Sequence, residues 1–143
     1  MQRHILTPLA LGLALAFSGA ASAETVLRAS HQFPGGQGDV RDEMVQLMAD
    51  KVAEADVDLK IEVYPGQSLF KAREQWAALS RGRLDITALP LDYASGRHPE
   101  FSATLMPGLV RNHEHAQRLN DSEFMGMIKE VIREGGARVL ADA

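Results

Sequence analysis

The chain has 143 residues, of which 45% are hydrophobic and 24% are charged, and its formal net charge is −4 at pH 7. These values are those of an ordinary globular domain, and the length suffices for one. There is no cysteine, which excludes disulfides and thiolate chemistry, and there is no basic patch dense enough to indicate nucleic-acid binding.

The first 23 residues have the three parts of an export signal. Arg3 supplies a positive start, residues 5–17 form an apolar run of 13 residues, and Ala21-Ser22-Ala23 gives the small-x-small pattern that signal peptidase cuts. The run is too short to span a bilayer, and no second long apolar run follows it. We therefore predict cleavage after Ala23, a periplasmic location and a mature protein that does not span the membrane. The alternative is a buried N-terminal helix.

The mature chain begins with a strand and a helix. Residues 25–30 have the pattern of a short strand, and a glycine-rich loop then leads to Asp39, a residue suited to cap a helix. The helix predicted over residues 39–55 has five apolar side chains at helical spacing, which we expect to face the core. These are Val40, Met44, Leu47, Met48 and Val52.

A second strand, a second helix and a third strand follow. Residues 59–63 alternate apolar with charged side chains, as a strand does. Residues 71–81 predict a helix that Gly82 ends, and residues 84–89 predict the third strand. The inner face of this helix would hold Ala72, Trp76 and Leu79.

Two more helices are predicted in the second half, after an irregular stretch that follows the third strand. Asn112 is placed to cap the first, over residues 113–120. Asn120 followed by Glu123 resembles a capping box for the second, which Gly135 would end.

Residues 137–143 have the pattern of a fourth strand. The alternation of strands and helices predicts the α/β class, with a mixed or mostly parallel sheet flanked by helices. A last strand with no helix to cover it further predicts an incomplete fold, so that residues 24–143 would form one lobe of a larger protein.

The sequence lacks motifs for catalysis or cofactor binding. The loop over residues 31–38 has neither a G-x-G-x-x-G nor a Walker pattern, and no serine lies in a G-x-S-x-G context. His113 and His115 would point to different sides of a helix, so they do not suit a shared metal. Asp42 and Glu43 are expected on an exposed helix face. We therefore expect a protein that is not an enzyme and has neither a metal nor a cofactor.

The loops that follow the first and third predicted strands carry more polar and aromatic side chains than a simple turn requires. In open α/β sheets, ligands bind outside the carboxyl ends of the strands. Here those ends run into loops that carry hydrogen-bonding and aromatic groups. We predict that His31, Phe33, Pro90 and Tyr93 line one wall of a ligand-binding cleft. The alternative for Tyr93 is a packed loop residue.

Several short motifs, in order and with fitting gaps, carry a resemblance to a known family. They are "VLRASHQF", "IEVYPGQSL", Arg73-Glu74, "GRLDI", "PEF", "MPGLV", "EHA" and "ARVLA". Over nearly the whole mature chain, the sequence resembles the periplasmic solute-binding subunit of tripartite ATP-independent periplasmic (TRAP) transporters, of the dicarboxylate-binding-protein-like kind.

This resemblance implies a two-lobed protein that closes on a small organic acid and delivers it to the TRAP membrane permease. It implies that an arginine pairs with the carboxylate of the solute, and that this arginine lies in a second lobe beyond residue 143. The first-lobe contacts of the family fall at His31 and at the loop that holds Pro90. Some members have an acidic residue where Pro90 or Ala72 stands here. A small secreted α/β enzyme, such as a hydrolase, remains the alternative function.

Overall fold

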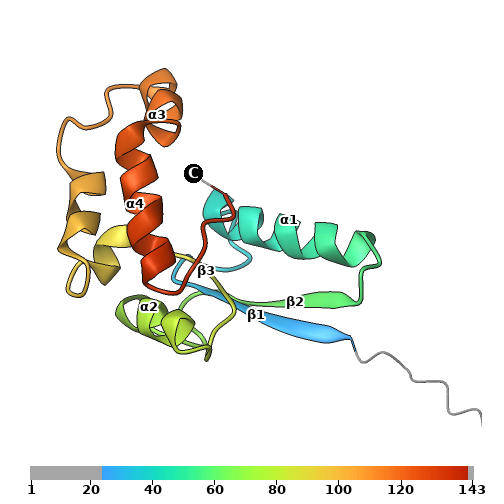
Figure 1. The fold of residues 1–143 in the computed structure, drawn as a ribbon. Coiled ribbons are helices and arrows are strands. Elements are labelled where there is room, and N and C mark those ends of the chain that lie inside the picture. Colours follow the sequence, from blue (N-terminus) through green and yellow to red (C-terminus); the bar gives the residue numbers. More distant parts are fainter. Residues whose placement is uncertain (1–23, 142–143) are drawn as a thin grey trace, which may run out of the picture.

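The computed structural model describes residues 24–141 (Figure 1). The predicted signal peptide and its cleavage site after Ala23 lie outside these residues. Within the described part of the chain, no helix is both long enough and apolar enough to cross a membrane.

A parallel sheet of three strands forms the base of the molecule. Its strands are β1 (Thr25–His31), β2 (Leu59–Tyr64) and β3 (Ile86–Ala88), in the order β2-β1-β3. Thr25 pairs with Leu59, and farther along β1 His31 pairs with Ala88. The predicted α/β fold with a mostly parallel sheet is confirmed.

β3 is shorter than the strand predicted over residues 84–89. The Arg28 backbone N–H donates to the Asp85 carboxylate at 2.8 Å, and the Asp85 N–H donates to the Arg28 carbonyl at 3.1 Å. The side chain of Asp85 therefore takes a position where a backbone carbonyl would continue the ladder, and the regular pairing begins only at Ile86.

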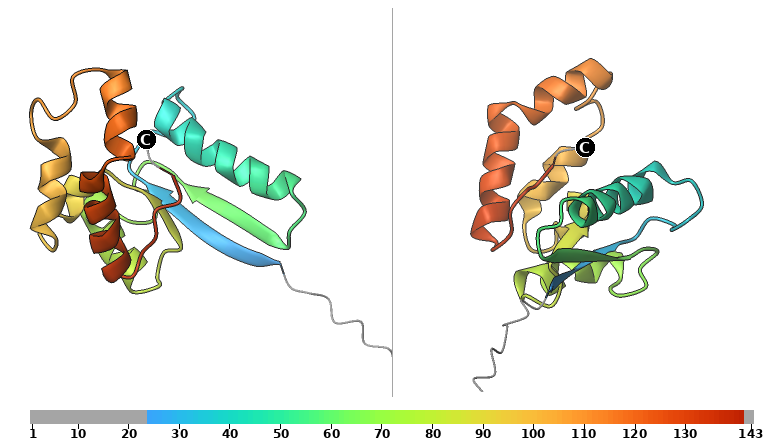
Figure 2. Two further views of the ribbon diagram at one scale, coloured as in Figure 1. Left: turned by 45° about the horizontal axis from the view of Figure 1, so that its top comes forward. Right: turned by 90° about the vertical axis from the view of Figure 1, so that its right-hand side faces the viewer.

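Helices α1 (Val40–Glu54) and α2 (Ala72–Ser80) cover opposite faces of the sheet (Figures 1 and 2). The Asp39 carboxylate caps α1 as predicted, because it accepts the Arg41 backbone N–H at 3.0 Å. Gly82 follows α2 with a φ of +66°, a conformation that favours glycine.

The predicted inner face of α1 is wrong for three of its five residues, whereas Met48 and Val52 are half-buried. Val40, Met44 and Leu47 are 65%, 50% and 56% exposed, whereas Asp42 and Val45 are buried. The cause is the carboxylate of Asp42, which accepts the Gly36 backbone N–H at 2.9 Å beneath the helix. This contact favours the rotation of α1 that leaves Val40, Met44 and Leu47 exposed.

The second half is more helical than predicted. Two 3₁₀ helices, η1 (Leu91–Ala94) and η2 (Pro99–Leu105), occupy the stretch that the sequence suggested was irregular. They are followed by α3 (His113–Asn120) and α4 (Glu123–Glu134). Figure 1 shows these elements at the left end of the sheet, with α4 above α2 and α3 at the top of the view.

The caps of α3 and α4 are side chains of the local sequence. Asn112 accepts the His115 backbone N–H at 2.8 Å, as predicted. The predicted capping box of Asn120 and Glu123 is wrong, because Ser122 is the residue that accepts the Met125 N–H at the start of α4. Gly135 ends α4 as expected.

The largest apolar core lies between α2, η2 and α4. It contains Trp76, Ala94, Phe101, Ile128 and Ile132, each at most 5% exposed. Trp76 and Phe101 meet edge to face with ring centroids 5.4 Å apart, a favourable aromatic geometry.

The fourth strand predicted after α4 does not form in the described residues. Residues 137–141 have no regular structure, and instead Ala137 and Val139 pack against the core between α2 and α4. The alternating apolar pattern therefore reflects contact with helices rather than with a neighbouring strand. The same pattern is produced by any extended segment with one buried side.

Candidate functional site

The carboxyl ends of β1 and β3 meet at one edge of the sheet. Because His31 pairs with Ala88 in parallel register, the segments that leave these two residues start side by side. The structure thus brings together the β1 loop, with His31 and Phe33, and the β3 loop, with Pro90 and Tyr93. This juxtaposition is the one that the sequence predicts for a ligand site.

On the β1 side, His31 is a buried member of a polar cluster. Its side chain is fully buried, and its Nε2 lies 3.1 Å from Asp42 Oδ1 at the start of α1. The Asp42 carboxylate also accepts the Gly36 backbone N–H at 2.9 Å. One buried carboxylate therefore joins the end of β1, the loop that follows it and the first turn of α1.

Burial and hydrogen bonding shift the ionisation of both groups in the same direction. Burial lowers the pKa of His31 below its ordinary value of 6.5, and the nearby Asp42 carboxylate opposes this only in part. The Gly36 N–H is the main group that holds the pKa of Asp42 below 3.8. At neutral pH this cluster consequently combines a carboxylate with a neutral imidazole.

Phe33 closes the β1 side of the site. It is 7% exposed, and its ring stacks on His31 with centroids 5.5 Å apart. The guanidinium carbon of Arg41 lies 4.2 Å from the centre of the same ring, which is a cation–π contact. Arg41 is itself held by the Asp39 carboxylate, with an Nη2–Oδ2 distance of 2.6 Å.

The β3 side is more open. Pro90 and Tyr93 are both half-buried, and the Tyr93 backbone N–H donates to the Pro90 carbonyl at 3.2 Å in the turn that begins η1. The guanidinium carbon of Arg73, on α2, lies 5.9 Å from the centre of the Tyr93 ring. Tyr93 is therefore positioned by contacts on one side while part of its surface stays accessible.

Four further polar atoms at this edge are buried and have no hydrogen-bond partner among the described residues. They are Ser30 Oγ, His31 Nδ1, Gln32 Oε1 and Asp92 Oδ1. Three belong to consecutive residues at the end of β1, and the fourth follows β3. Because an unpaired buried polar atom costs free energy, such atoms normally have a partner in water or in a ligand.

Sequence reasoning missed Asp42 and Asp92. Asp42 is 3% exposed, so the expectation that it lies on a solvated helix face is wrong. Its place three residues after the cap Asp39 could have indicated a role in the first turn, since side chains at that position reach back toward the preceding loop. Asp92 stands between the two predicted residues Pro90 and Tyr93, but nothing in its local pattern indicates that its Oδ1 is buried.

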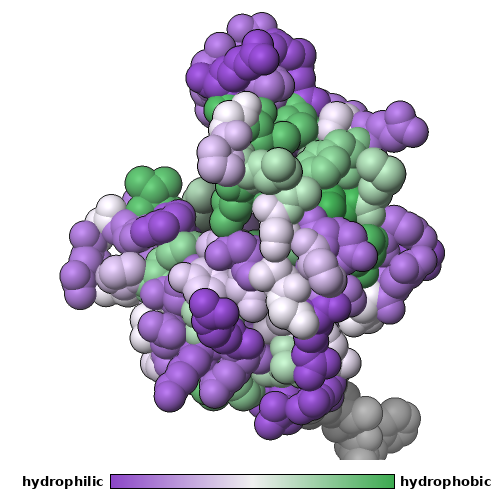
Figure 3. Space-filling view, turned by 90° about the vertical axis from the view of Figure 1, so that its left-hand side faces the viewer, coloured by the Kyte–Doolittle hydropathy of each residue, from purple (hydrophilic) through white to green (hydrophobic). Residues whose placement is uncertain are grey.

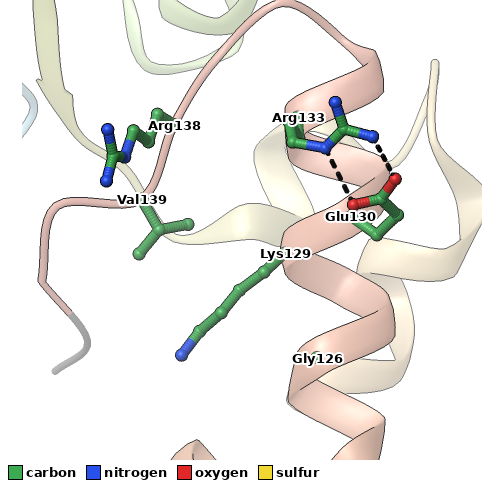
Figure 4. A pocket seen from close by; sticks show the side chains of 6 residues that line it. All are labelled: Gly126, Lys129, Glu130, Arg133, Arg138 and Val139. Atoms are coloured by element: carbon green, nitrogen blue, oxygen red, sulfur yellow. Dashed lines mark hydrogen bonds and ion pairs between the residues drawn. The ribbon is translucent and has the colours of Figure 1, made fainter.

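Two grooves on the described residues have none of the four predicted residues in their lining. One, of about 450 Å³, is lined by residues of α4 and of the segment after it, among them Lys129, Glu130 and Arg138. Figure 4 shows Glu130 turned toward Arg133, away from Lys129 and Arg138. The other, of about 420 Å³, lies on the outer side of α2. Within residues 24–141, no group of three or more histidine, aspartate or glutamate side chains is arranged to hold a metal ion.

The parallel sheet with polar loops after its strands has the arrangement beside which open α/β sheets bind ligands. Comparison with known proteins identifies a family with this kind of fold. The model of the bacterial extracellular solute-binding protein family 7 matches residues 32–142. The chain therefore belongs to this family, and the resemblance noted from the sequence motifs is confirmed.

Individual relatives are similar over most of this chain. A solute-binding protein of Albidiferax ferrireducens is 38% identical over 95% of this chain and 42% of its own length. The crystal structure of a TRAP periplasmic solute-binding protein from Rhodoferax ferrireducens, with bound malonate, matches with a TM-score of 0.72. It is 39% identical over 76% of this chain and 36% of that chain.

A more distant structure supports the fold alone. A TRAP periplasmic solute-binding protein from Sulfurospirillum deleyianum, with bound succinate, has a TM-score of 0.72 at 20% identity, covering 80% of this chain and 36% of that chain. The present chain thus spans well under half the length of the relatives that it matches.

Proposed function

We propose that the protein captures a small organic carboxylate in the periplasm and delivers it to the membrane permease of a TRAP transporter. In this proposal, residues 24–141 supply one wall of the solute site, with His31, Phe33, Pro90 and Tyr93 along it. The membership of the family and the malonate-bound relative at 39% identity support this class of function. No observation favours the alternative of a secreted hydrolase.

The observation that carries the proposal is the set of unpartnered polar atoms at the end of β1 and at the start of η1. Gln32 Oε1 and Asp92 Oδ1 are acceptors, and they would be satisfied by a hydroxyl group or a water carried in with the solute. Such a solute would rest against Phe33 and Tyr93 as apolar supports. A site with few placed polar groups among aromatic surfaces is typical of small-molecule binding.

The test is calorimetric titration of a form extended to the length of the relatives, with malonate and succinate as the probes. Tyr93→Ala should weaken binding at least tenfold with little change in the melting temperature, because Tyr93 is half-buried and lies outside the main apolar core. Tyr93→Phe, the matched control, keeps the ring and should retain most of the affinity. A large drop in melting temperature with unchanged affinity would make Tyr93 a packing residue.

Export is proposed with the same function. Mass spectrometry of the protein from the periplasmic fraction should show Glu24 as the first residue, as the small-x-small pattern before it predicts. An uncleaved product confined to the cytoplasm would contradict this location.

A further inference from the structure

An unusual concentration of arginine surrounds the groove on the outer side of α2. The groove has a volume of about 420 Å³, and its lining comes from α2, from the turn after it and from the connection between η1 and η2. Its charged and aromatic lining residues are Phe70, Arg73, Glu74, Arg81, Arg83 and Arg97. All four arginines are exposed.

These arginines have no ion pair among the described residues. Arg73 and Arg83 lie over the rings of Tyr93 and Phe70, at 5.9 and 5.7 Å. The carboxylate of Glu74 is engaged elsewhere, since it accepts the Lys71 backbone N–H at 3.2 Å. Elsewhere in the described residues, four arginines have carboxylate partners and two, Arg111 and Arg138, have no ion pair. The paired ones are Arg28, Arg41, Arg118 and Arg133.

The groove is therefore a positive area on a chain whose net charge is −4. Four arginines against one glutamate leave a local charge of +3. In Figure 3 hydrophilic side chains predominate in the lower half of the molecule, where α2 lies, and the broadest apolar area is in the upper half.

We propose that this groove docks on the phosphodiester headgroups of an anionic lipid membrane. Guanidinium groups bind phosphate oxygens through paired N–H donors, and here they converge from three separate segments on one shallow hollow. The inference goes beyond solute capture, and it uses only the periplasmic location from the proposed function. A protein bound to the membrane surface would reach its permease by diffusing along the membrane rather than through the whole periplasm.

The open, exposed geometry favours a lipid surface over other anions. A single free phosphate would be weakly bound by exposed arginines that water and salt screen. A membrane surface instead presents many headgroups at once, and the contributions of several basic residues near it add together. A protein partner would be expected to find an apolar centre in its interface, and the lining here offers only Phe70 and Ala77.

The test is sedimentation of the exported form, which begins at Glu24, with lipid vesicles at low and at physiological salt. The vesicles are phosphatidylcholine alone, or phosphatidylcholine mixed with phosphatidylglycerol. Each arginine near an anionic surface contributes about fivefold to partitioning, so R73Q/R81Q/R83Q/R97Q, which removes four of them, should bind the mixed vesicles about 600-fold less. The control K51Q/K60Q/R118Q/R133Q removes the same charge elsewhere and should bind like the wild type.

The outcomes separate lipid docking from its alternatives. Binding to the mixed vesicles alone, weakened by salt and lost only in the groove variant, supports the proposal. An equal loss of vesicle binding in the groove variant and in the control variant would show that binding depends only on net charge, and it would overturn the proposal. Arginine-dependent binding of a polyglutamate peptide without vesicle binding would overturn the proposal in favour of an acidic protein partner.

Displacement of the protein from vesicles by inorganic phosphate, beyond that caused by another salt at the same ionic strength, would overturn the proposal in favour of a discrete phosphate site. Circular dichroism confirms the fold of each variant, and solute titration is a separate measurement that can fail independently.

Discussion

The interior has two regions of contrasting chemistry. Between α2 and α4, Trp76, Phe101 and Ile128 are packed as apolar and aromatic neighbours. At the carboxyl edge of β1, by contrast, His31 and Asp42 are nearly as buried but are polar, and several adjacent polar atoms have no partner. The first region excludes water and gains from burial. The second holds groups that would be more stable in water.

This difference indicates a division of labour within one small fold. Apolar packing between helices stabilises the molecule, and that stability allows the sheet edge to keep polar groups buried without full compensation. Buried polar groups of this kind normally have a partner in ordered water or in a ligand. The comparison can be tested by substituting side chains in each region and measuring the change in the free energy of unfolding.

Removal of Phe101 should have the largest effect on stability. Its side chain is fully buried against Trp76, and Phe101→Ala should cost about 3–5 kcal/mol through lost burial and a cavity. Urea unfolding followed by tryptophan fluorescence measures the change. The control is Phe70→Ala, because Phe70 is only half-buried and lies just before α2. A cost below about 1 kcal/mol would show that this region is not the main source of stability.

Removal of the Asp42 side chain should have the next largest effect. Asp42→Ala would leave the Gly36 N–H and the His31 ring without their acceptor, at a cost of about 1–3 kcal/mol. Glu43→Ala, in the same helical turn but exposed, is the matched control and should change stability by less than about 0.5 kcal/mol. Equal effects from the two substitutions would contradict the tie between α1 and the β1 loop.

The same cluster predicts how stability depends on pH. Because the folded-state pKa of His31 is lowered, the unfolded chain binds the proton more readily, and stability is lost as pH falls below 6.5 toward the folded pKa. The slope can reach about 1.4 kcal/mol per pH unit for one proton. Urea midpoints measured from pH 7.5 down to 5.5 should therefore fall. Midpoints that rise over this range would mean that attraction to Asp42 outweighs burial.

Local signals in the sequence were sufficient for most elements. Within residues 24–141, periodicity and capping residues located the three strands and four α-helices, and the strand-end rule placed His31 and Pro90 at one edge. The failures depend on contacts between distant residues. The rotation of α1 follows from Asp42, the shortness of β3 from the pairing of Asp85 with Arg28, and the form of the last segment from packing on helices.

The candidate site was predicted only in outline for the same reason. A pattern of residues indicates which side chains follow a strand, but it does not show which of them become buried. His31 and Phe33 are covered by their neighbours, whereas Tyr93 keeps an accessible surface. Burial of this kind is decided by tertiary packing, which one sequence does not reveal.

The smallest expected effect tests the corrected face of α1. Leu47 is 56% exposed, so Leu47→Gln should change the free energy of unfolding by less than about 0.5 kcal/mol. Val45 is 7% exposed on the opposite side, and Val45→Ala should cost about 2 kcal/mol, since two methyl groups are lost from a packed position. Both variants are compared by urea unfolding under identical conditions. If the order is reversed, the apolar stripe faces the sheet after all, and the tie through Asp42 does not set the rotation of the helix.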